Sequence, residues 1–429
     1  MRVLLLMPTN TYHAADFVSA AERLDVAVTV GTNGSQALQA LTPGSTLTLD
    51  FSDLDGATQA IEEFHRTFPI GAVVAAEDET TALAAAVGTA LALPHNPLDA
   101  VLPTRSKLSL RQTLSEAGLP SPAFRVLDLG EGFADAARPE RDQRIRSATG
   151  GFDDRGRFSF PRVLKPTFLA ASRGVIRADD DIEFRAATRR IGEILHAEKR
   201  AGGGNAESHL ILVEEYIPGP EYAVEAMLRD GALRLLALFD KPDPMEGPYF
   251  EETIYVTPSR ADESSQRAIV ETVERAVGAL GLREGPLHAE MRVNASGVFL
   301  VDIAARSIGG LCPRVLRFGT GVSLEELILL HAMGEEVDDV RREGNAAGVM
   351  MIPIPTAGVL RGVGGLNEAK RVEGVREITF TINQGQPVVP LPEGNRYLGF
   401  IFAHAATPEE AEAALRSAHA RLRLEIEPA

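Results

Sequence analysis

The chain has 429 residues, 45% of them hydrophobic and 24% charged, and at about 150 residues per domain this length predicts about three globular domains. Its 60 acidic and 43 basic residues give a formal net charge of −17, which opposes contact with nucleic-acid phosphates, so we expect no nucleic-acid partner. The one cysteine, Cys312, excludes an intrachain disulfide and a cysteine-rich zinc site and is compatible with the reducing cytoplasm, the expected location.

The N-terminal region alternates short apolar runs with amphipathic stretches. The runs predict strands at 3–7, 26–30 and 72–75, and the stretches between them predict helices at 14–24 and 57–68. Such alternation is typical of a parallel sheet with helices on its faces. We therefore predict a doubly wound α/β domain over residues 1–104, which ends in a proline-rich connector.

No apolar run predicts a membrane partner. The run at the N-terminus has about five residues, which is shorter than the apolar region of a signal peptide. The longest run, residues 82–93, falls short of the roughly 20 residues that cross a bilayer.

The central region predicts a helix followed by antiparallel strands. The helix covers 107–117, a polar stretch at 131–157 predicts a long loop, and strands are expected at 158–165, 210–216, 221–228 and 232–239. The sequence Arg229-Asp-Gly231 is a strong hairpin signal between the last two strands. We assign residues 105–345 to this domain, with a mobile lid at about 120–215.

The C-terminal region, residues 346–429, predicts a small α+β cap. Strands are expected at 349–354, 375–382 and 398–402, a glycine-rich turn at 358–365, and a final helix at 408–421.

Glu290 and Asp302 lie on two predicted strands around a tight turn at Ala295-Ser-Gly297. A three-residue loop would pair Asn294 with Val298 and place the two carboxylates opposite each other on one face. Two such acids repel unless a cation separates them, and their hard oxygens suit Mg²⁺ with bound phosphates. The alternative is a two-residue turn, which shifts the register by one residue and places the acids on opposite faces.

Two lysines and one loop are candidates for binding phosphate. Lys107 begins the predicted helix, and Lys165 ends an apolar strand before a proline, where ligands collect. Ser172-Arg-Gly174 supplies a hydroxyl, a guanidinium and a flexible glycine. A lone lysine is normally a solvated surface group, and the position of Lys165 at a strand end favours a binding role for it. Without Lys165, the segment 172–174 would be interpreted as an ordinary turn.

Other nucleotide and hydrolase signatures are missing. The sequence has no Walker pattern and no Gly-x-Gly-x-x-Gly between a strand and a helix, which disfavours P-loop and Rossmann sites. Ser172 lacks a nucleophile elbow and Cys312 has no evident histidine partner.

Taken in chain order, a set of charged and glycine-bearing segments resembles the motifs of the ATP-grasp superfamily. The set consists of Lys107, Val163-Leu-Lys165, Ala171-Ser-Arg-Gly-Val175, Val213-Glu-Glu-Tyr-Ile-Pro-Gly219 with Glu221, Glu290, and Leu300-Val-Asp-Ile-Ala-Ala-Arg306. Within the superfamily, the chain looks most like L-amino acid ligases and related carboxylate–amine ligases. The resemblance implies an N-terminal doubly wound parallel-sheet domain, a central antiparallel ATP-grasp domain and a small C-terminal α+β cap.

The resemblance implies an ATP site. Lys107 and Lys165 would hold the α and β phosphates, and Ser172, Arg173 and Gly174 would close over the transferring phosphate. The adenine would lie along the segment Glu214, Glu215, Tyr216 and Ile217, and Glu221 would take the ribose hydroxyls.

Glu290 and Asp302 would bind Mg²⁺ or Mn²⁺. The superfamily commonly shows Glu-x-Asn where this chain has Asp302-Ile-Ala304, so one carboxylate is shorter and one amide ligand is missing. This departure leaves the number of metal ions open.

The substrate residues also follow from the resemblance. Arg306 would hold the substrate carboxylate and its acyl phosphate, a role that suits a planar bidentate donor, with Gly309 and Gly310 beside it. The segment 239–252 resembles a substrate-side loop in which Glu252 meets an ammonium group and Lys241 lies near the phosphates. The alternative for this segment is a proline-rich surface loop with solvated acids.

We therefore predict an ATP-dependent ligase that joins a small carboxylate to an amine through an acyl phosphate, with an amino acid as one substrate. A purine-biosynthesis or carboxylase-like ATP-grasp enzyme and a non-catalytic ATP-binding module are the alternatives. The resemblance also suggests a homodimer.

Overall fold

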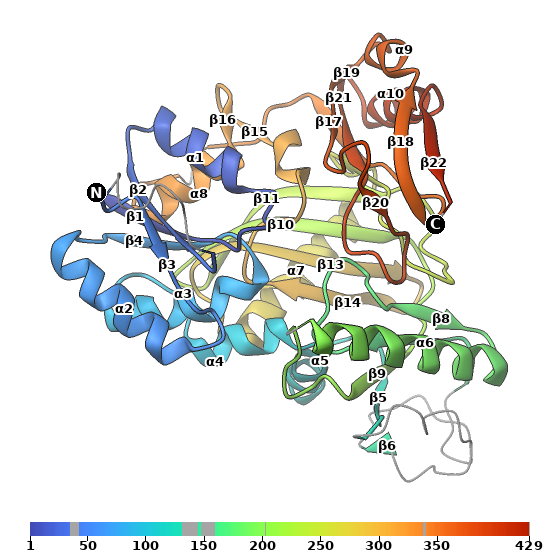
Figure 1. Ribbon diagram of the computed structural model, residues 1–429, viewed down its shortest axis with the longest axis horizontal. Helices are drawn as coiled ribbons and strands as arrows, with labels where there is room; N and C mark the ends of the chain where they lie inside the picture. Colours follow the sequence, from blue (N-terminus) through green and yellow to red (C-terminus); the bar gives the residue numbers. More distant parts are fainter. Residues whose placement is uncertain (35–42, 131–144, 147–158, 202, 338–339, 429) are drawn as a thin grey trace.

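The computed structural model describes residues 1–429 except 35–42, 131–144, 147–158, 202, 338–339 and 429. Figure 1 shows a central sheet with an N-terminal α/β unit at one end, a smaller sheet carrying α6 below it and the C-terminal unit above it. Most of the predicted loop at 131–157 lies outside the described residues. No helix in the described part of the chain is long and apolar enough to span a membrane.

The N-terminal unit is a parallel sheet covered by helices, as predicted. Its strands lie in the order β3 (Thr46–Thr48), β2 (Ala27–Thr32), β1 (Arg2–Leu6) and β4 (Ala72–Ala75). The helices are α1 (Ala14–Arg23), α2 (Leu54–Thr67), α3 (Asp78–Ala90) and the short α4 (Leu98–Val101). Alternate residues of β1 face opposite layers, because Val3 and Leu5 pack with α1 whereas Leu4 and Leu6 pack with α2 and α3.

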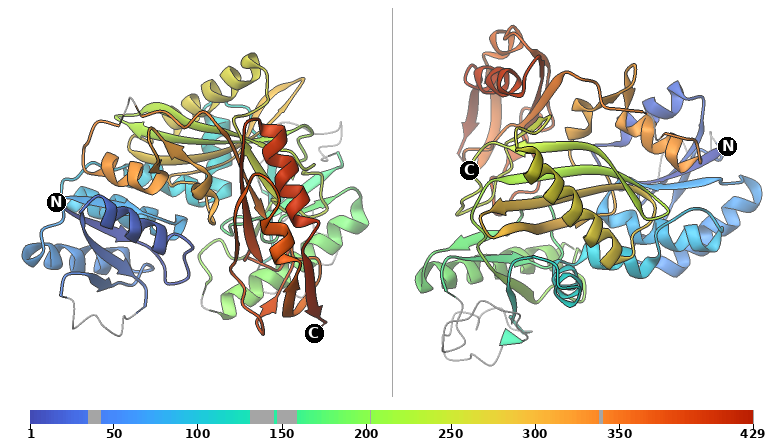
Figure 2. Two further views of the ribbon diagram at one scale, coloured as in Figure 1. Left: turned by 90° about the horizontal axis from the view of Figure 1, so that it is seen from above. Right: turned by 180° about the vertical axis from the view of Figure 1, so that it is seen from behind.

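The central sheet is antiparallel and continues into the C-terminal region. Its order is β14 (Gly297–Ala304), β13 (Gly285–Asn294), β10 (Glu221–Arg229), β11 (Ala232–Lys241), β12 (Ile254–Thr257), β17 (Ala346–Met351), β21 (Gly399–Ala405) and β19 (Val375–Phe380). Helix α7 (Glu263–Leu280) lies along the sheet (Figure 2) and its apolar side packs on β10, β13 and β14. The predicted boundary at 345/346 therefore falls inside one continuous sheet and stays a prediction.

The hairpin between β10 and β11 confirms the turn signal. Asp230 and Gly231 have φ of 52° and 83°, the left-handed conformations that a two-residue hairpin turn requires.

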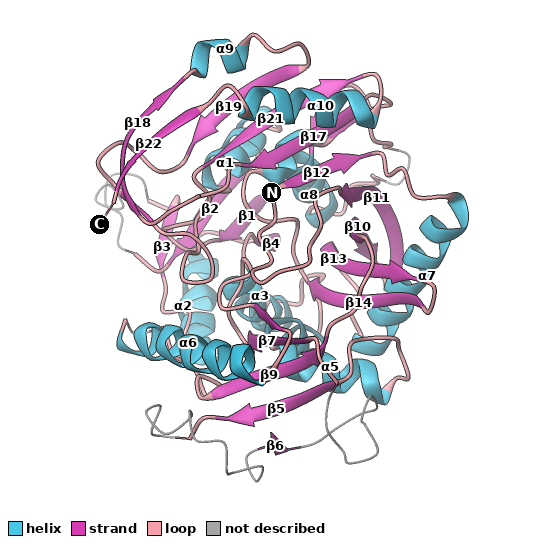
Figure 3. Cartoon of the chain, turned by 90° about the vertical axis from the view of Figure 1, so that its right-hand side faces the viewer, coloured by secondary structure: helices cyan, strands magenta, loops and turns pink. Residues whose placement is uncertain are grey.

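A second, smaller sheet carries the predicted phosphate-binding loop. Its order is β6 (Ile145–Arg146), β5 (Phe124–Asp128), β9 (Leu210–Glu215), β7 (Arg162–Pro166) and β8 (Ile176–Ala178). Helix α6 (Asp181–Arg200) packs on it through Ile191 and Leu195, and α5 (Lys107–Glu116) leads into it (Figure 3). The expected strand at 158–165 is shorter than predicted, because Pro161 has no backbone N–H to pair.

The C-terminal unit differs from prediction at its glycine-rich segment. Residues 358–365 do not form a turn but contain β18 (Gly358–Gly364), which pairs with β20 (Pro387–Val388) and β22 (Arg423–Glu427). A Cβ on Gly358 would lie 2.2 Å from the Glu427 carbonyl oxygen, so this glycine permits close strand approach. β22 itself was not predicted.

The remaining elements complete the layers around these sheets. Helix α10 (Pro408–His419) covers β17 and β21, and α9 (Leu366–Lys370) precedes β19. Helix α8 (Leu324–Ala332), strands β15 (Arg317–Phe318) and β16 (Val322–Ser323), and the 3-10 turns at Leu102–Arg105 and Cys312–Val315 lie between the central sheet and the N-terminal unit.

Candidate functional site

A large cavity lies where the N-terminal unit, the smaller sheet and the central sheet meet. Its volume is about 1840 Å³. Most predicted site residues line it: Lys107, Lys165, Ser172, Arg173, Glu214, Glu215, Tyr216, Ile217, Glu221, Glu252, Glu290, Asp302, Arg306, Gly309 and Gly310. Lys241 and Gly174 are not among the lining residues. The fold thus brings together segments that are up to about 200 residues apart in the chain.

One face of the central sheet supplies the charged wall of this cavity. On β13, His288, Glu290 and Arg292 alternate with Ala289 and Met291, which pack toward α7. Register pairs these polar residues with Glu225, Ala223 and Glu221 of β10, respectively. Because side chains alternate along a strand, the charged groups share one face.

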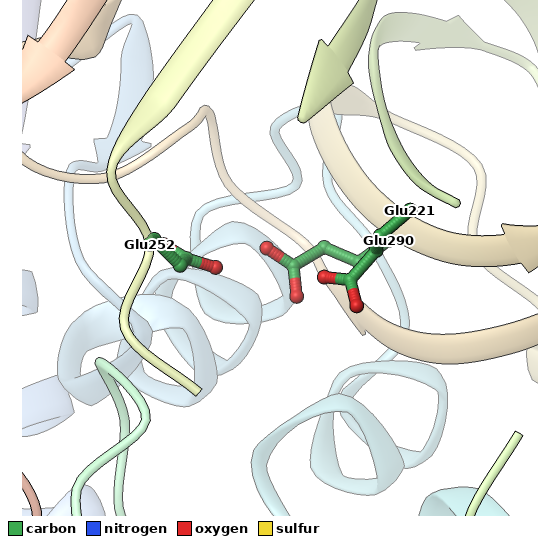
Figure 4. A group of neighbouring side chains, drawn as sticks. All are labelled: Glu221, Glu252 and Glu290. Carbon is green, nitrogen blue, oxygen red and sulfur yellow. The ribbon is translucent and has the colours of Figure 1, made fainter. Parts of the chain in front are cut away.

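Lys241 occupies the centre of a carboxylate cluster formed by Glu221, Glu252 and Glu290 (Figure 4 shows the three acids). Its Nζ atom donates to one oxygen of each acid at 2.8, 2.9 and 2.8 Å. Burial lowers the pKa of Lys241, but the three carboxylates together raise it well above its ordinary value. The lysine therefore stays charged and balances part of the negative charge.

The acids of the cluster differ in their affinity for protons. Burial raises the pKa of Glu252 to about 7, with Lys241 opposing and Glu290 adding to the rise. For Glu290, burial is outweighed by Lys241 and His288, which hold its pKa well below the usual range. Near neutral pH, Glu252 is therefore the acid of this pair that gains and loses a proton.

The carboxylate cluster already holds a cation, the Lys241 ammonium. Ligand oxygens of Glu221, Glu252 and Glu290 all lie within 4.8 Å of one another, a spacing that suits one shared cation, and Lys241 Nζ lies between them. The sequence instead paired Glu290 with Asp302 as metal ligands. Asp302 also lines the cavity, so Glu290 belongs both to the Lys241 cluster and to the candidate metal pair.

The β13–β14 hairpin pairs Glu290 with Asp302 by a route that the sequence did not predict. The turn has two residues, Ala295 and Ser296, with Asn294 paired to Gly297, so the expected three-residue loop is wrong. A bulge then leaves Val301 without a partner on β13 and restores Glu290 opposite Asp302. The carboxylate pair was predicted correctly because two register shifts cancel.

Arg111 of α5 holds that bulge and was missed by the sequence reasoning. Its side chain is fully buried, with NH2 donating to the Val301 carbonyl at 2.6 Å and Nε donating to Glu214 at 2.7 Å. Lys165 Nζ lies 2.6 Å from the other Glu214 oxygen. Burial raises the pKa of Glu214, but these two cations lower it below its ordinary value. One buried carboxylate thus fixes the predicted Lys165 and the unpredicted Arg111.

Arg292 was also missed, although the polar–apolar alternation on β13 is a signal that could have found it. Nε donates to Glu221 at 2.9 Å, NH1 donates to the Ile217 carbonyl at 2.8 Å, and NH2 donates to the Met245 carbonyl. It therefore joins the predicted ribose residue, the end of the adenine segment and the substrate-side loop.

His288 links the cluster to the glycine segment after Arg306. Nδ1 lies 3.1 Å from Glu225 and Nε2 lies 3.4 Å from Glu290. Burial lowers the pKa of His288, but the two acids raise it to about 9. Both oxygens of Glu225 accept from the Ile308 backbone N–H at 3.1 Å, so the acid also anchors the chain beside Gly309 and Gly310.

Arg306 joins the cavity to the N-terminal unit. NH2 donates to Asp78 at 2.7 Å, at the start of α3, and NH1 donates to the Ser307 carbonyl at 2.8 Å. Its Nε is buried and has no partner among the described residues. Burial lowers the pKa of Arg306, but Asp78 and other acids outweigh it and keep the guanidinium charged. Arg306 thus lines the cavity and retains one buried donor without a partner among the described residues.

The predicted phosphate residues other than Gly174 line the same cavity from α5, β7 and the loop between β7 and β8. Lys107 Nζ donates to the Leu169 carbonyl at 2.7 Å, next to the loop that contains Ser172 and Arg173. Gly174 has φ of 73°, and a Cβ there would lie 2.7 Å from a Pro166 side-chain atom. The position therefore requires glycine.

Comparisons with known families match three successive parts of the chain. A model of the ATP-grasp domain matches residues 158–314, one of the ATP-grasp N-terminal domain matches 18–95, and one of the L-amino acid ligase C-terminal domain 2 matches 350–427.

Two solved structures and one curated relative illustrate the similarity. The L-amino acid ligase from Bacillus licheniformis is 25% identical with a TM-score of 0.77, covering 100% of this chain and 99% of that one. The ATP complex of carboxyaminoimidazole ribonucleotide synthase from Aspergillus clavatus is 16% identical with a TM-score of 0.67, covering 98% and 99% of the two chains. The alanine–anticapsin ligase of Bacillus subtilis is 30% identical over 194 residues, which cover 42% of this chain and 40% of that protein.

Proposed function

The chain belongs to the ATP-grasp superfamily of ligases, and from this premise we propose that it joins the carboxylate of one small molecule to the amine of another, at least one of them an amino acid. The match to an L-amino acid ligase over both full lengths supports this substrate class. ATP would supply the energy, with ADP and phosphate as the other products.

One observation carries the proposal: a single cavity is lined by the paired carboxylates Glu290 and Asp302, which offer hard oxygens to a divalent cation, and by the guanidinium of Arg306. Phosphoryl transfer to a carboxylate needs both elements. A bound metal would neutralise negative charge on the phosphates, and the guanidinium would bind the carboxylate that attacks. Glu290 and Asp302 would hold the metal, because both line the cavity from paired strand positions and offer hard oxygen ligands.

The reaction would proceed in two steps. A carboxylate oxygen of the first substrate attacks the γ-phosphorus of ATP, and ADP leaves. The amine nitrogen of the second substrate then attacks the acyl carbon, phosphate leaves, and the nitrogen loses a proton. Proximity and fixed charges carry most of the acceleration in such transfers.

The side chains of this protein have distinct roles in these steps. Lys107 of α5 and Lys165 of β7 would bind the phosphates, and Arg306 would orient the attacking carboxylate. Glu252 would bind the ammonium group of the second substrate, and its pKa of about 7 suits it to accept the proton that the amine loses.

The test is ATP-dependent release of ADP by the purified protein with Mg²⁺, supplied with amino acids and small carboxylic acids in pools, separately and together. Release that requires a pool supports the ligase and starts the identification of substrates. ATP binding without release under every mixture would point to a non-catalytic nucleotide-binding module and contradict the proposal.

The variant Arg306→Ala tests the central residue. We expect it to abolish pool-dependent ADP release while the fold is retained. A matched control is Arg260→Ala, because Arg260 also bridges separate elements, through Asp240 and Glu412, but lies outside the cavity. Turnover by Arg306→Ala equal to that of the control would remove Arg306 from its role.

A further inference from the structure

The loop at 171–174, here called the phosphate loop, contacts a segment of the C-terminal unit. This segment, residues 389–397, connects β20 to β21 and is called the strap. In Figure 1 the red chain beyond β20 descends toward the green α6 and β8. The Gly174 backbone N–H donates to the Pro392 carbonyl at 2.9 Å, and Arg173 Nε donates to the Glu393 carbonyl at 3.1 Å.

The phosphate loop has a conformation that needs such support. Ala171 and Ser172 have φ of 53° and 54°, in the left-handed region that side chains with a Cβ disfavour by roughly 1 kcal/mol or more per residue. Two consecutive residues of this kind persist only when their surroundings fix them. The strap holds the next two residues of the loop, Arg173 and Gly174, from a part of the chain more than 200 residues away.

The strap also binds helix α6, which packs behind the phosphate loop. Arg190 of α6 binds both oxygens of Glu393, with Nε at 2.6 Å and NH2 at 2.9 Å, a bidentate ion pair. The Arg190 guanidinium also lies over the Tyr249 ring, 5.1 Å from its centroid. Glu393 therefore joins the strap to α6 while its own carbonyl holds the phosphate loop.

The other end of the strap reaches the carboxylate cluster. Tyr397 lines the large cavity, and its hydroxyl lies 3.4 Å from Glu252. A second cavity of about 30 Å³, lined by Ser172, Glu252 and Tyr397 among others, lies between the strap and the site. The strap thus contacts both the phosphate loop and Glu252, the predicted ammonium-binding residue.

We propose that Glu393 is a positioning residue for ATP: by binding Arg190, it seats the strap and fixes the phosphate loop in the conformation that receives the triphosphate. The inference rests on the proposed function, since it assigns the loop to ATP. Glu393 lines neither cavity, so its effect passes through the loop. Its loss should weaken contacts to phosphates and leave contacts to adenine and ribose unchanged.

The experiment measures the Kd of Mg²⁺ with the non-hydrolysable ATP analogue AMP-PNP, and separately the Kd of adenosine, by calorimetry. Glu393→Gln should raise the AMP-PNP Kd about threefold, the effect of a half-exposed ion pair. Glu393→Arg places a cation beside Arg190 and Arg173 and should raise it about tenfold. The adenosine Kd should stay within about twofold of wild type in both variants.

Charge exchange provides a rescue and a matched control. The double variant Arg190→Glu with Glu393→Arg restores an opposite-charge pair and should recover at least about half of the lost binding free energy. Glu427→Arg reverses a similar exposed pair, with Arg361, on the far sheet of the same unit and should leave both Kd values unchanged.

The outcomes separate the inference from the proposed function. A selective loss of AMP-PNP affinity with rescue by charge exchange supports the inference. Wild-type AMP-PNP affinity in Glu393→Arg, or an equal loss of adenosine and AMP-PNP affinity, overturns it. Failure of the wild-type protein to bind either AMP-PNP or adenosine would refute the proposed function, and the inference with it.

Discussion

Replacement of His288 by glutamine should remove one defined part of the pH dependence of stability. The imidazole lies between Glu225 and Glu290, which raise its pKa to about 9 against an ordinary value near 6.5. A difference of this size corresponds to about 3 kcal/mol of preference for the charged imidazolium in the folded state.

The sign follows from proton binding. Because the folded state binds the proton more tightly than the unfolded state, the stabilisation is fully present below about pH 6.5 and is lost as the pH rises through about 9. Glu252, whose pKa is raised to about 7, loses its contribution in a lower window, between about pH 4.5 and 7. The effects of His288 and Glu252 on stability therefore occur in different pH ranges.

The assay is urea unfolding of the metal-free wild type and of His288→Gln at several values between about pH 6 and 10. The difference in the free energy of unfolding between the two proteins should shrink by about 3 kcal/mol across this range. Glutamine keeps a polar, uncharged side chain in the same place, which makes the comparison one of charge. A difference that stays constant from pH 6 to 10 would refute the reasoning.

Three further predictions concern other residues of the site and its frame. Lys241→Met leaves one buried and two half-buried acids without their cation, so it should lower stability by roughly 3–5 kcal/mol. Mg²⁺ should stabilise this variant more than wild type in thermal melts, and an equal metal effect in both would contradict the role of the cluster. Arg111→Met removes the donor to the bulge carbonyl and to Glu214, so it should weaken metal-dependent nucleotide binding about tenfold. An unchanged affinity in calorimetry would show that the bulge forms without Arg111. Gly219→Ala should lower the free energy of unfolding by more than about 2 kcal/mol in chemical denaturation, because φ is 120° and the new Cβ would lie 2.1 Å from a backbone oxygen. The control Gly278→Ala, in open space on α7, should raise the free energy of unfolding by about 1 kcal/mol.

Much of the fold was readable from local patterns. Apolar runs and amphipathic stretches predicted β1, β2, β4, α1 and α2, and Arg229-Asp-Gly231 predicted the β10–β11 hairpin. These patterns succeed because a strand or helix facing a core imposes its own period on the sequence. The glycines of β18 misled the same reasoning, since glycine marks close approach between strands as well as turns.

The sequence predicted residues that line the cavity but not the contacts between their side chains. The order of charged segments identified Lys165, Glu221, Glu290 and Arg306, all of which line the cavity. Their roles toward ATP, metal and substrates stay predictions. The position of Lys241 among three acids does not follow from spacing, because those acids come from three separate segments.

What the sequence by itself determined is the set of elements and the side chains that each carries. The tertiary structure decided which of them meet. Arg111 reaches a bulge carbonyl 190 residues away, and Arg190 reaches Glu393 across 203 residues. No local period in the sequence encodes such contacts, because they depend on how whole sheets pack once the chain has folded. Arg111, which the sequence pattern did not reveal, is the residue that holds both the bulge and Glu214 in place.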